Sequence, residues 1–139
     1  MTTIRTALAA AALAASIGAG HAQEALMTGD ASAGEGVFRR CQACHAVGEG
    51  AVNKVGPQLN ELFGRVPAGL EDYAYSGAME EYGENHVWDV ATLAEYLRAP
   101  RKVVRGTKMA FAGLRKDEDI ADVLAYLAQF DPEGMETGQ

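Results

Sequence analysis

The segment Cys-Gln-Ala-Cys-His at residues 41–45 holds both cysteines of this 139-residue chain and places a histidine directly after the second. A Cys-x-x-Cys pair serves three chemistries: a metal site, a redox-active dithiol, or the covalent attachment of haem. In the third, the two thiols form thioethers with the vinyl groups of haem, and the adjoining histidine is an axial ligand of the iron.

The first two chemistries lack the partners that they need. A structural zinc site wants four ligands, usually as two separated pairs. Cys44 and His45 are adjacent and cannot easily both face one tetrahedral ion, and His86 has no second ligand nearby. A thioredoxin-like dithiol would follow a strand in a βαβ unit, and the sequence shows no such unit. The pattern therefore favours haem, with Cys41 and Cys44 as tethers and His45 as an iron ligand.

The first 22 residues have the pattern of a secretory signal peptide. Arg5 is the basic residue, an eleven-residue apolar run follows at 7–17, and the small residues Gly20 and Ala22 precede a cleavage site before Gln23. An uncleaved membrane anchor would need about 20 apolar residues. We expect a cleaved signal at residues 1–22 and a periplasmic mature protein of residues 23–139, a single domain with an ordered core at about 29–130.

The charges of the chain are unevenly distributed. Loss of Arg5 leaves 11 basic and 19 acidic residues, a net charge of −8, which argues against nucleic-acid binding. Residues 98–116 nevertheless carry seven basic residues and no acidic one: Arg98, Arg101, Lys102, Arg105, Lys108, Arg115 and Lys116. Such a run can be an ordinary solvated face, but in so acidic a chain it predicts a positive docking side.

Hydrophobic periodicity predicts a small all-α domain with three main helices. The first begins at the N-cap Asp30 and extends over 31–44; the second covers 89–100 and ends at Pro100. The third begins at the cap Asp117 and carries an apolar stripe at Ile120, Val123, Leu124 and Leu127. Residues 23–29 and 132–139 are expected to be loose tails.

The segment 46–88 is rich in glycine, asparagine and proline and shows little periodicity, apart from a short helix expected near 77–82. A loop segment of this length is costly in a compact domain unless it surrounds something. A large apolar cofactor would supply the core that three short helices lack.

The second axial ligand is less clear from the residues alone. Met109 lies in "GTKMAFAG", far enough along the chain from His45 to reach the opposite face of a haem. A lone methionine is also common core packing, so spacing leaves both roles open. His86 would give a bis-histidine iron, although a histidine in the polar loop "GENHVW" is usually a surface residue.

At this point the chain resembles the class I cytochromes c, in the branch of mitochondrial cytochrome c and the bacterial cytochromes c2. The resemblance covers about 29–130. It rests on these motifs: "GEGVFRRCQACH", "VGPQLNELFGR", "YAYSGAM", Trp88, "TLAEYLRAP", "GTKMAFAG" and "EDIADVLAYL".

The resemblance implies roles for individual residues. Met109 would be the sixth ligand of the iron, the Pro57 carbonyl would hold His45, and Tyr96 would hydrogen-bond near the Met109 sulfur. Arg65, Tyr75 and Trp88 would satisfy the haem propionates. The first and last helices would cross at four positions: Gly34, Phe38, Val123 and Tyr126. Three residues depart from the family pattern: Glu61 replaces a glycine, Arg105 a proline and Met79 an asparagine.

The implied function is that of a soluble, monomeric one-electron carrier, not an enzyme, cycling one haem c between ferric and ferrous states. Its partners would be redox proteins that dock at the basic haem edge, with Arg39, Arg40 and Lys54 adding to that edge. A cytochrome bc-type complex, a terminal oxidase, a photosynthetic reaction centre or a periplasmic dehydrogenase would each suit it. The alternative is a haem enzyme or gas sensor with a labile sixth coordination site.

Overall fold

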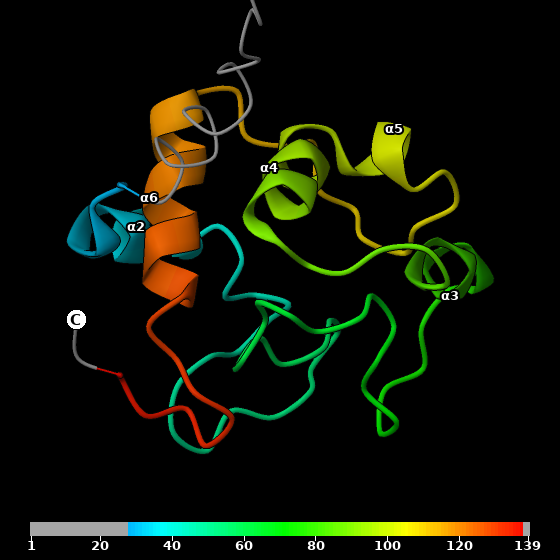
Figure 1. The fold of residues 1–139 in the computed structure, drawn as a ribbon, viewed down its shortest axis with the longest axis horizontal. Coiled ribbons are helices and arrows are strands. Elements are labelled where there is room, and N and C mark those ends of the chain that lie inside the picture. The colour runs from blue at the N-terminus through cyan, green and yellow to red at the C-terminus, as the bar shows by residue number, and fades with distance from the viewer. Residues whose placement is uncertain (1–27, 138–139) are drawn as a thin grey trace, which may run out of the picture.

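The computed structural model describes residues 28–137, so the expected signal peptide lies outside the described residues. Within this range the chain is helical: α2 (Ala31–Phe38), α3 (Gly77–Gly83), α4 (Val90–Arg98), α5 (Pro100–Val103) and α6 (Asp117–Leu127) (Figure 1). The described part contains an isolated antiparallel bridge between Phe130 and Glu136 and no named strand. The all-α prediction is confirmed. None of these helices is long and apolar enough to cross a membrane.

Helix α2 begins where the sequence predicts and ends earlier. The Asp30 side chain accepts hydrogen bonds from the Ser32 and Ala33 amides and so caps the helix. The prediction that the helix runs to residue 44 is wrong, because α2 ends at Phe38. The chain then tightens into turns, with the Cys41 amide 2.7 Å from the Phe38 carbonyl oxygen and the Cys44 amide 3.0 Å from that of Cys41. These turns present the two cysteines.

Helices α2 and α6 cross at close range, as Figure 1 shows on its left side. A Cβ atom on Gly34 would lie 2.0 Å from the Asp122 carbonyl oxygen and 2.8 Å from the Tyr126 Cβ, so only glycine permits this approach. The Phe38 and Tyr126 rings pack with centroids 5.5 Å apart. The nearly buried Asp122 carboxylate accepts the Asp30 amide at 2.7 Å and ties the start of α2 to α6.

The other helix ends differ slightly from the predictions. Pro100 does not simply end the second helix: α4 stops at Arg98, and Pro100 then opens the short α5, where its missing N–H costs nothing. Lys116, not Asp117, is the N-cap of α6. Asp117 lies in the first turn, where a carboxylate is favoured by the helix dipole. The predicted stripe of α6 is buried, with Ile120 and Leu124 fully so.

The loops of residues 46–76 form the lower half of the molecule in Figure 1, and the C-terminal segment packs against them. The buried Asn60 side chain binds both the amide and the carbonyl of Gly48, at 2.8 and 3.0 Å. A Cβ on Gly134 would lie 2.0 Å from the Gly48 carbonyl oxygen. The Thr137 amide donates to the Gln129 carbonyl at 2.7 Å. The prediction of a loose C-terminal tail is therefore wrong up to residue 137.

Candidate haem site

The His45 ring is held by a backbone carbonyl. Its Nδ1 lies 2.7 Å from the Pro57 carbonyl oxygen. Because a carbonyl can only accept, Nδ1 must carry the hydrogen, which leaves the lone pair of Nε2 available to a metal. Burial lowers the pKa of His45, while the Pro57 hydrogen bond opposes that effect. The site therefore favours the neutral imidazole, the form that binds iron.

Gly56 sets the space around this ring, a role that the sequence analysis did not recognise. A Cβ on Gly56 would lie 2.4 Å from His45 Cε1 and 2.8 Å from Nε2, far inside van der Waals contact. The Gly56 amide also donates to the Cys44 carbonyl at 2.7 Å. The glycine before Pro57 was the available signal, since close backbone approach to a ring requires the absence of a side chain.

The two cysteines are both free thiols and partly buried. Burial raises the pKa of the Cys41 thiol, and the nearby Arg40 charge opposes the rise. Within residues 28–137, no three or more His, Cys, Asp or Glu side chains are grouped so that they could hold a metal ion. Two thiols and an oriented imidazole in consecutive turns fit haem c.

Met109 lies in a loop anchored at both ends to the helices. The Val104 amide donates to the Pro100 carbonyl, and the Leu114 amide donates to the Leu97 carbonyl, each at 2.9 Å. Met109 is half-buried and packs against the hydrophobic core. This loop follows the α4–α5 region, whereas His45 follows α2, so the two predicted ligands come from separate parts of the fold.

A hydroxyl pair braces the Met109 loop. Thr107 Oγ1 accepts the Met109 amide at 3.3 Å and lies 3.1 Å from the Tyr96 hydroxyl oxygen. The Tyr96 hydroxyl also donates to the Met109 sulfur at 4.0 Å, the arrangement that the resemblance implies. Thr107 was not predicted as a functional residue, because its place two residues before the methionine is the one feature of the sequence that indicates its role. Iron ligation by Met109 stays a prediction.

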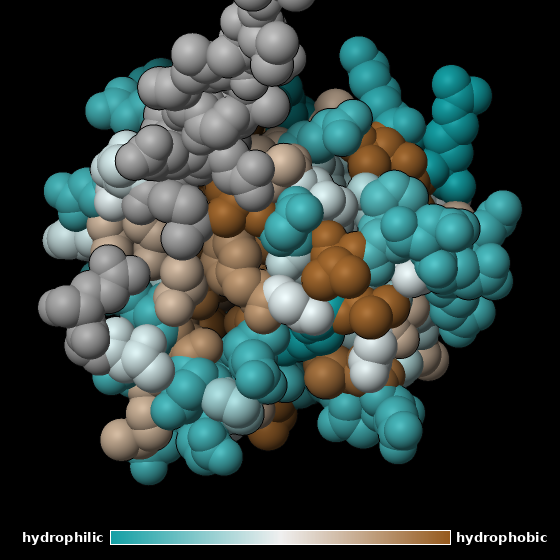
Figure 2. All heavy atoms as spheres, viewed as in Figure 1, coloured by the Kyte–Doolittle hydropathy of each residue, from teal (hydrophilic) through white to brown (hydrophobic). Residues whose placement is uncertain are grey.

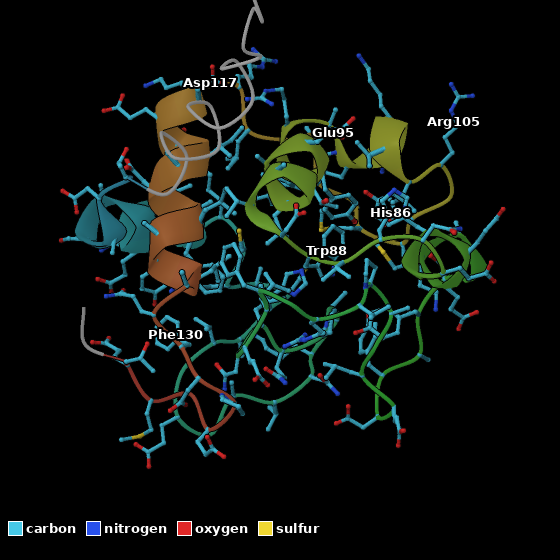
Figure 3. The ribbon with its side chains drawn as sticks, in the orientation of Figure 1. His86, Trp88, Glu95, Arg105, Asp117 and Phe130 are labelled. Carbon is cyan, nitrogen blue, oxygen red and sulfur yellow. The ribbon has the colours of Figure 1, made fainter. Side chains whose placement is uncertain are left out.

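Arg65 and Trp88 are placed together by the backbone. The Trp88 amide donates to the Arg65 carbonyl and the Gly64 amide to the Trp88 carbonyl, both at 2.9 Å. Trp88 is buried beneath α4, with its ring centroid 5.1 Å from that of Tyr96 (Figure 3). The Arg65 guanidinium donates to the carbonyls of Gln58, at 3.0 Å, and Asn60.

The positive charge of Arg65 suits the binding of an anionic group. Burial lowers the pKa of Arg65 and raises the pKa of Tyr75, and each of the two residues opposes the shift of the other. Arg65 takes part in neither of the two ion pairs found within residues 28–137. A partly buried guanidinium that donates to backbone carbonyls and forms no ion pair with a carboxylate of the described residues fits a bound carboxylate. The assignment of Arg65, Tyr75 and Trp88 to the propionates stays a prediction.

His86 lies apart from these groups. Its side chain is exposed beside α3, where the ring stacks on Tyr82 at a centroid distance of 3.8 Å (Figure 3). His86 Nδ1 is 2.7 Å from the Tyr82 carbonyl oxygen. These local contacts favour Met109 over His86 as the second ligand. Met79, at the family's asparagine position, is buried in the core.

The basic residues are exposed but not all uncompensated. Arg98 forms an ion pair with Asp117, and Arg40 forms one with Asp119 at 3.2 Å. Arg105 extends from the outer edge of the molecule (Figure 3). On the face of the molecule drawn in Figure 2, hydrophobic residues reach the surface in the middle and hydrophilic side chains lie along the margins.

The helical fold and the oriented Cys-x-x-Cys-His segment define a class of protein: the chain belongs to the cytochrome c family, whose model matches residues 31–131. It has the all-α fold of the class I cytochromes c, which are haem proteins that carry electrons.

Within the family the chain is similar to bacterial cytochromes c2. It is 57% identical over 105 residues to cytochrome c2 of Afifella marina, covering 75% of this chain and 85% of that protein. It is 46% identical over 106 residues to cytochrome c-550 of Nitrobacter winogradskyi, covering 76% and 95%. The solved structure of cytochrome c2 from Rhodospirillum centenum matches with a TM-score of 0.71 and 34% identity, covering 75% of this chain and all of that one.

Proposed function

We propose that this chain is a periplasmic one-electron carrier that holds one haem c through Cys41 and Cys44, with His45 and Met109 as the axial ligands of its iron. The observation that carries the proposal is the orientation of His45, whose Nδ1 is engaged by Pro57 at 2.7 Å while Nε2 is left for a metal. When bound, the haem supplies the one-electron change between ferric and ferrous iron.

The chain's own residues would keep the ligands in place during that change. Pro57 holds the His45 tautomer and ring direction. Thr107 and Tyr96 fix the Met109 loop, and Tyr96 directs its hydroxyl toward the sulfur. Ligation of the iron by a methionine sulfur and an apolar surrounding of the haem both favour the ferrous state, and so they raise the reduction potential. Electron transfer without ligand exchange then requires little rearrangement of the protein.

The visible spectrum of the oxidised holoprotein tests the ligand set. We expect a far-red band from methionine sulfur to ferric iron at neutral pH, together with a low-spin spectrum. A missing band, with high-spin iron that binds carbon monoxide readily, would instead support the haem enzyme or gas sensor.

The basic side of the molecule supports docking onto acidic redox partners. Arg101 and Lys102 of α5 and Arg105 beside it are exposed and have no ion-pair partner among residues 28–137. Charges of one sign gathered near the site of electron transfer steer oppositely charged partners, and salt screens that attraction. A quinol-oxidising bc-type complex, a terminal oxidase, a reaction centre and a periplasmic dehydrogenase remain equally suitable partners.

A small anionic oxidant can measure this steering. We expect oxidation of the ferrous protein by ferricyanide to slow several-fold as ionic strength rises from about 10 to 200 mM, because local attraction is screened. The acidic net charge of the whole chain would produce the opposite slope. Neutralising Arg101 and Lys102 to glutamine should flatten the dependence. The matched control is Arg98→Gln, expected to act less because Asp117 already compensates Arg98. A rate that rises or stays constant with salt contradicts local steering.

A further inference from the structure

Glu61 has an unusual backbone for its residue type. Its φ is +48°, in the left-handed region where a non-glycine residue costs on the order of 1–2 kcal/mol. Glycine, the usual family residue at this position, would adopt the same conformation without that cost. Residues held in such strained conformations cluster at functional sites, so we infer that the Glu61 carboxylate has a role.

The left-handed turn directs the peptide unit that joins Asn60 to Glu61. The carbonyl of this unit, on Asn60, accepts a hydrogen bond from the Arg65 guanidinium. Its N–H, on Glu61, donates to the Phe130 carbonyl at 3.1 Å. The backbone conformation of Glu61 therefore sets the position of Arg65 and joins it to the segment that follows α6.

Glu61 also lies close enough to Arg65 for the two charges to interact. Both residues line one cavity of about 410 Å³, together with Gln58, Asn60, Phe63 and Pro132. Glu61 is exposed, and its negative charge partly opposes the lowering of the Arg65 pKa by burial. The carboxylate thus offsets some of the positive field of the guanidinium.

We propose that Glu61 is a positioning residue that lowers the reduction potential of the bound haem by partly compensating the charge of Arg65. The inference rests on the proposed function, in which Arg65 lies beside the haem propionates. Ferric haem carries one more positive charge than ferrous haem, so a nearby carboxylate favours the ferric form. Two unit charges that are about 10 Å apart in a water-like dielectric interact strongly enough to change an equilibrium about twofold, which sets the size of effect that we expect.

Redox titration of holoprotein carrying Glu61→Gln tests the charge alone, because glutamine keeps the side-chain length and the left-handed strain. We expect the ferrous-to-ferric ratio at a given applied potential to rise about twofold at low ionic strength, and the difference to shrink as salt is added. Glu61→Gly should produce the same redox shift and also raise the free energy of unfolding, because glycine relieves the strain. Glu118→Gln changes an exposed residue of α6 that lies outside the cavity; it is the control and should shift the potential less.

Two results would overturn the inference: a Glu61→Gln protein that titrates like the wild type at low salt, or a shift found only in Glu61→Gly, which would assign the effect to the backbone. The far-red spectrum of the same samples distinguishes failure of the inference about Glu61 from failure of the proposed function. A wild-type protein with the methionine band and no Glu61 effect contradicts this inference alone.

Discussion

Replacement of Met109 by alanine is expected to remove the far-red band of the oxidised protein and open one axial position of the iron. The Thr107 side chain in the loop and the Tyr96 hydroxyl on α4 would remain, but neither replaces a thioether sulfur as a ligand. Loss of methionine ligation should lower the reduction potential by on the order of 0.1–0.3 V, within the roughly 0.8 V that axial ligands span. Spectroscopy with and without carbon monoxide, and a redox titration, measure both effects.

The control for this experiment is Met135→Ala. Met135 is 54% exposed in the C-terminal segment, so its loss should leave the spectrum, carbon monoxide binding and potential unchanged. If Met109→Ala keeps the band of the wild type, Met109 is not the ligand and its half-buried side chain has only a packing role.

The second large effect is expected at the helix crossing. Gly34→Ala introduces a Cβ 2.0 Å from the Asp122 carbonyl oxygen, which is backbone and cannot rotate away. Helices α2 and α6 must then separate, which disturbs the packing of Phe38 on Tyr126. We expect the free energy of unfolding to fall by about 3 kcal/mol or more, at the upper end of the cost of overpacking. Denaturant titration of the holoprotein measures the change.

Gly36→Ala provides a control within the same helix. A Cβ on Gly36 meets no atom within 4 Å, and the residue is exposed. Alanine should therefore raise the free energy of unfolding by up to about 1 kcal/mol, the difference in helix propensity. Equal effects of the two substitutions would mean that the tight contact at Gly34 does not limit the crossing.

Patterns within short segments carried most of the correct predictions. The stripe of α6, the Asp30 cap and the short helix near 77–82 each depend on neighbours in the chain, so the sequence indicates them directly. The errors lie where tertiary contacts override local preference. The apolar spacing of Cys41 and Cys44 continued the pattern of α2, yet turns replace the helix after Phe38.

The long loops show the same division. Composition indicated that residues 46–88 are irregular, but it did not predict that the Asn60 side chain forms two hydrogen bonds with the backbone of Gly48. Nor did it show that the C-terminal segment folds back, because the contact of Gly134 with Gly48 joins residues far apart in the chain.

By itself, the sequence predicted the attachment chemistry and determined the fold class, because Cys41, Cys44 and His45 lie within five residues and helical periodicity is local. The tertiary structure decided which atoms meet: Pro57 with His45 Nδ1, Thr107 with Tyr96, Asp117 with Arg98, and the Asn60 carbonyl with Arg65. Such pairings depend on how loops and helices pack at long sequence separation. No periodic pattern along the chain predicts these individual pairings.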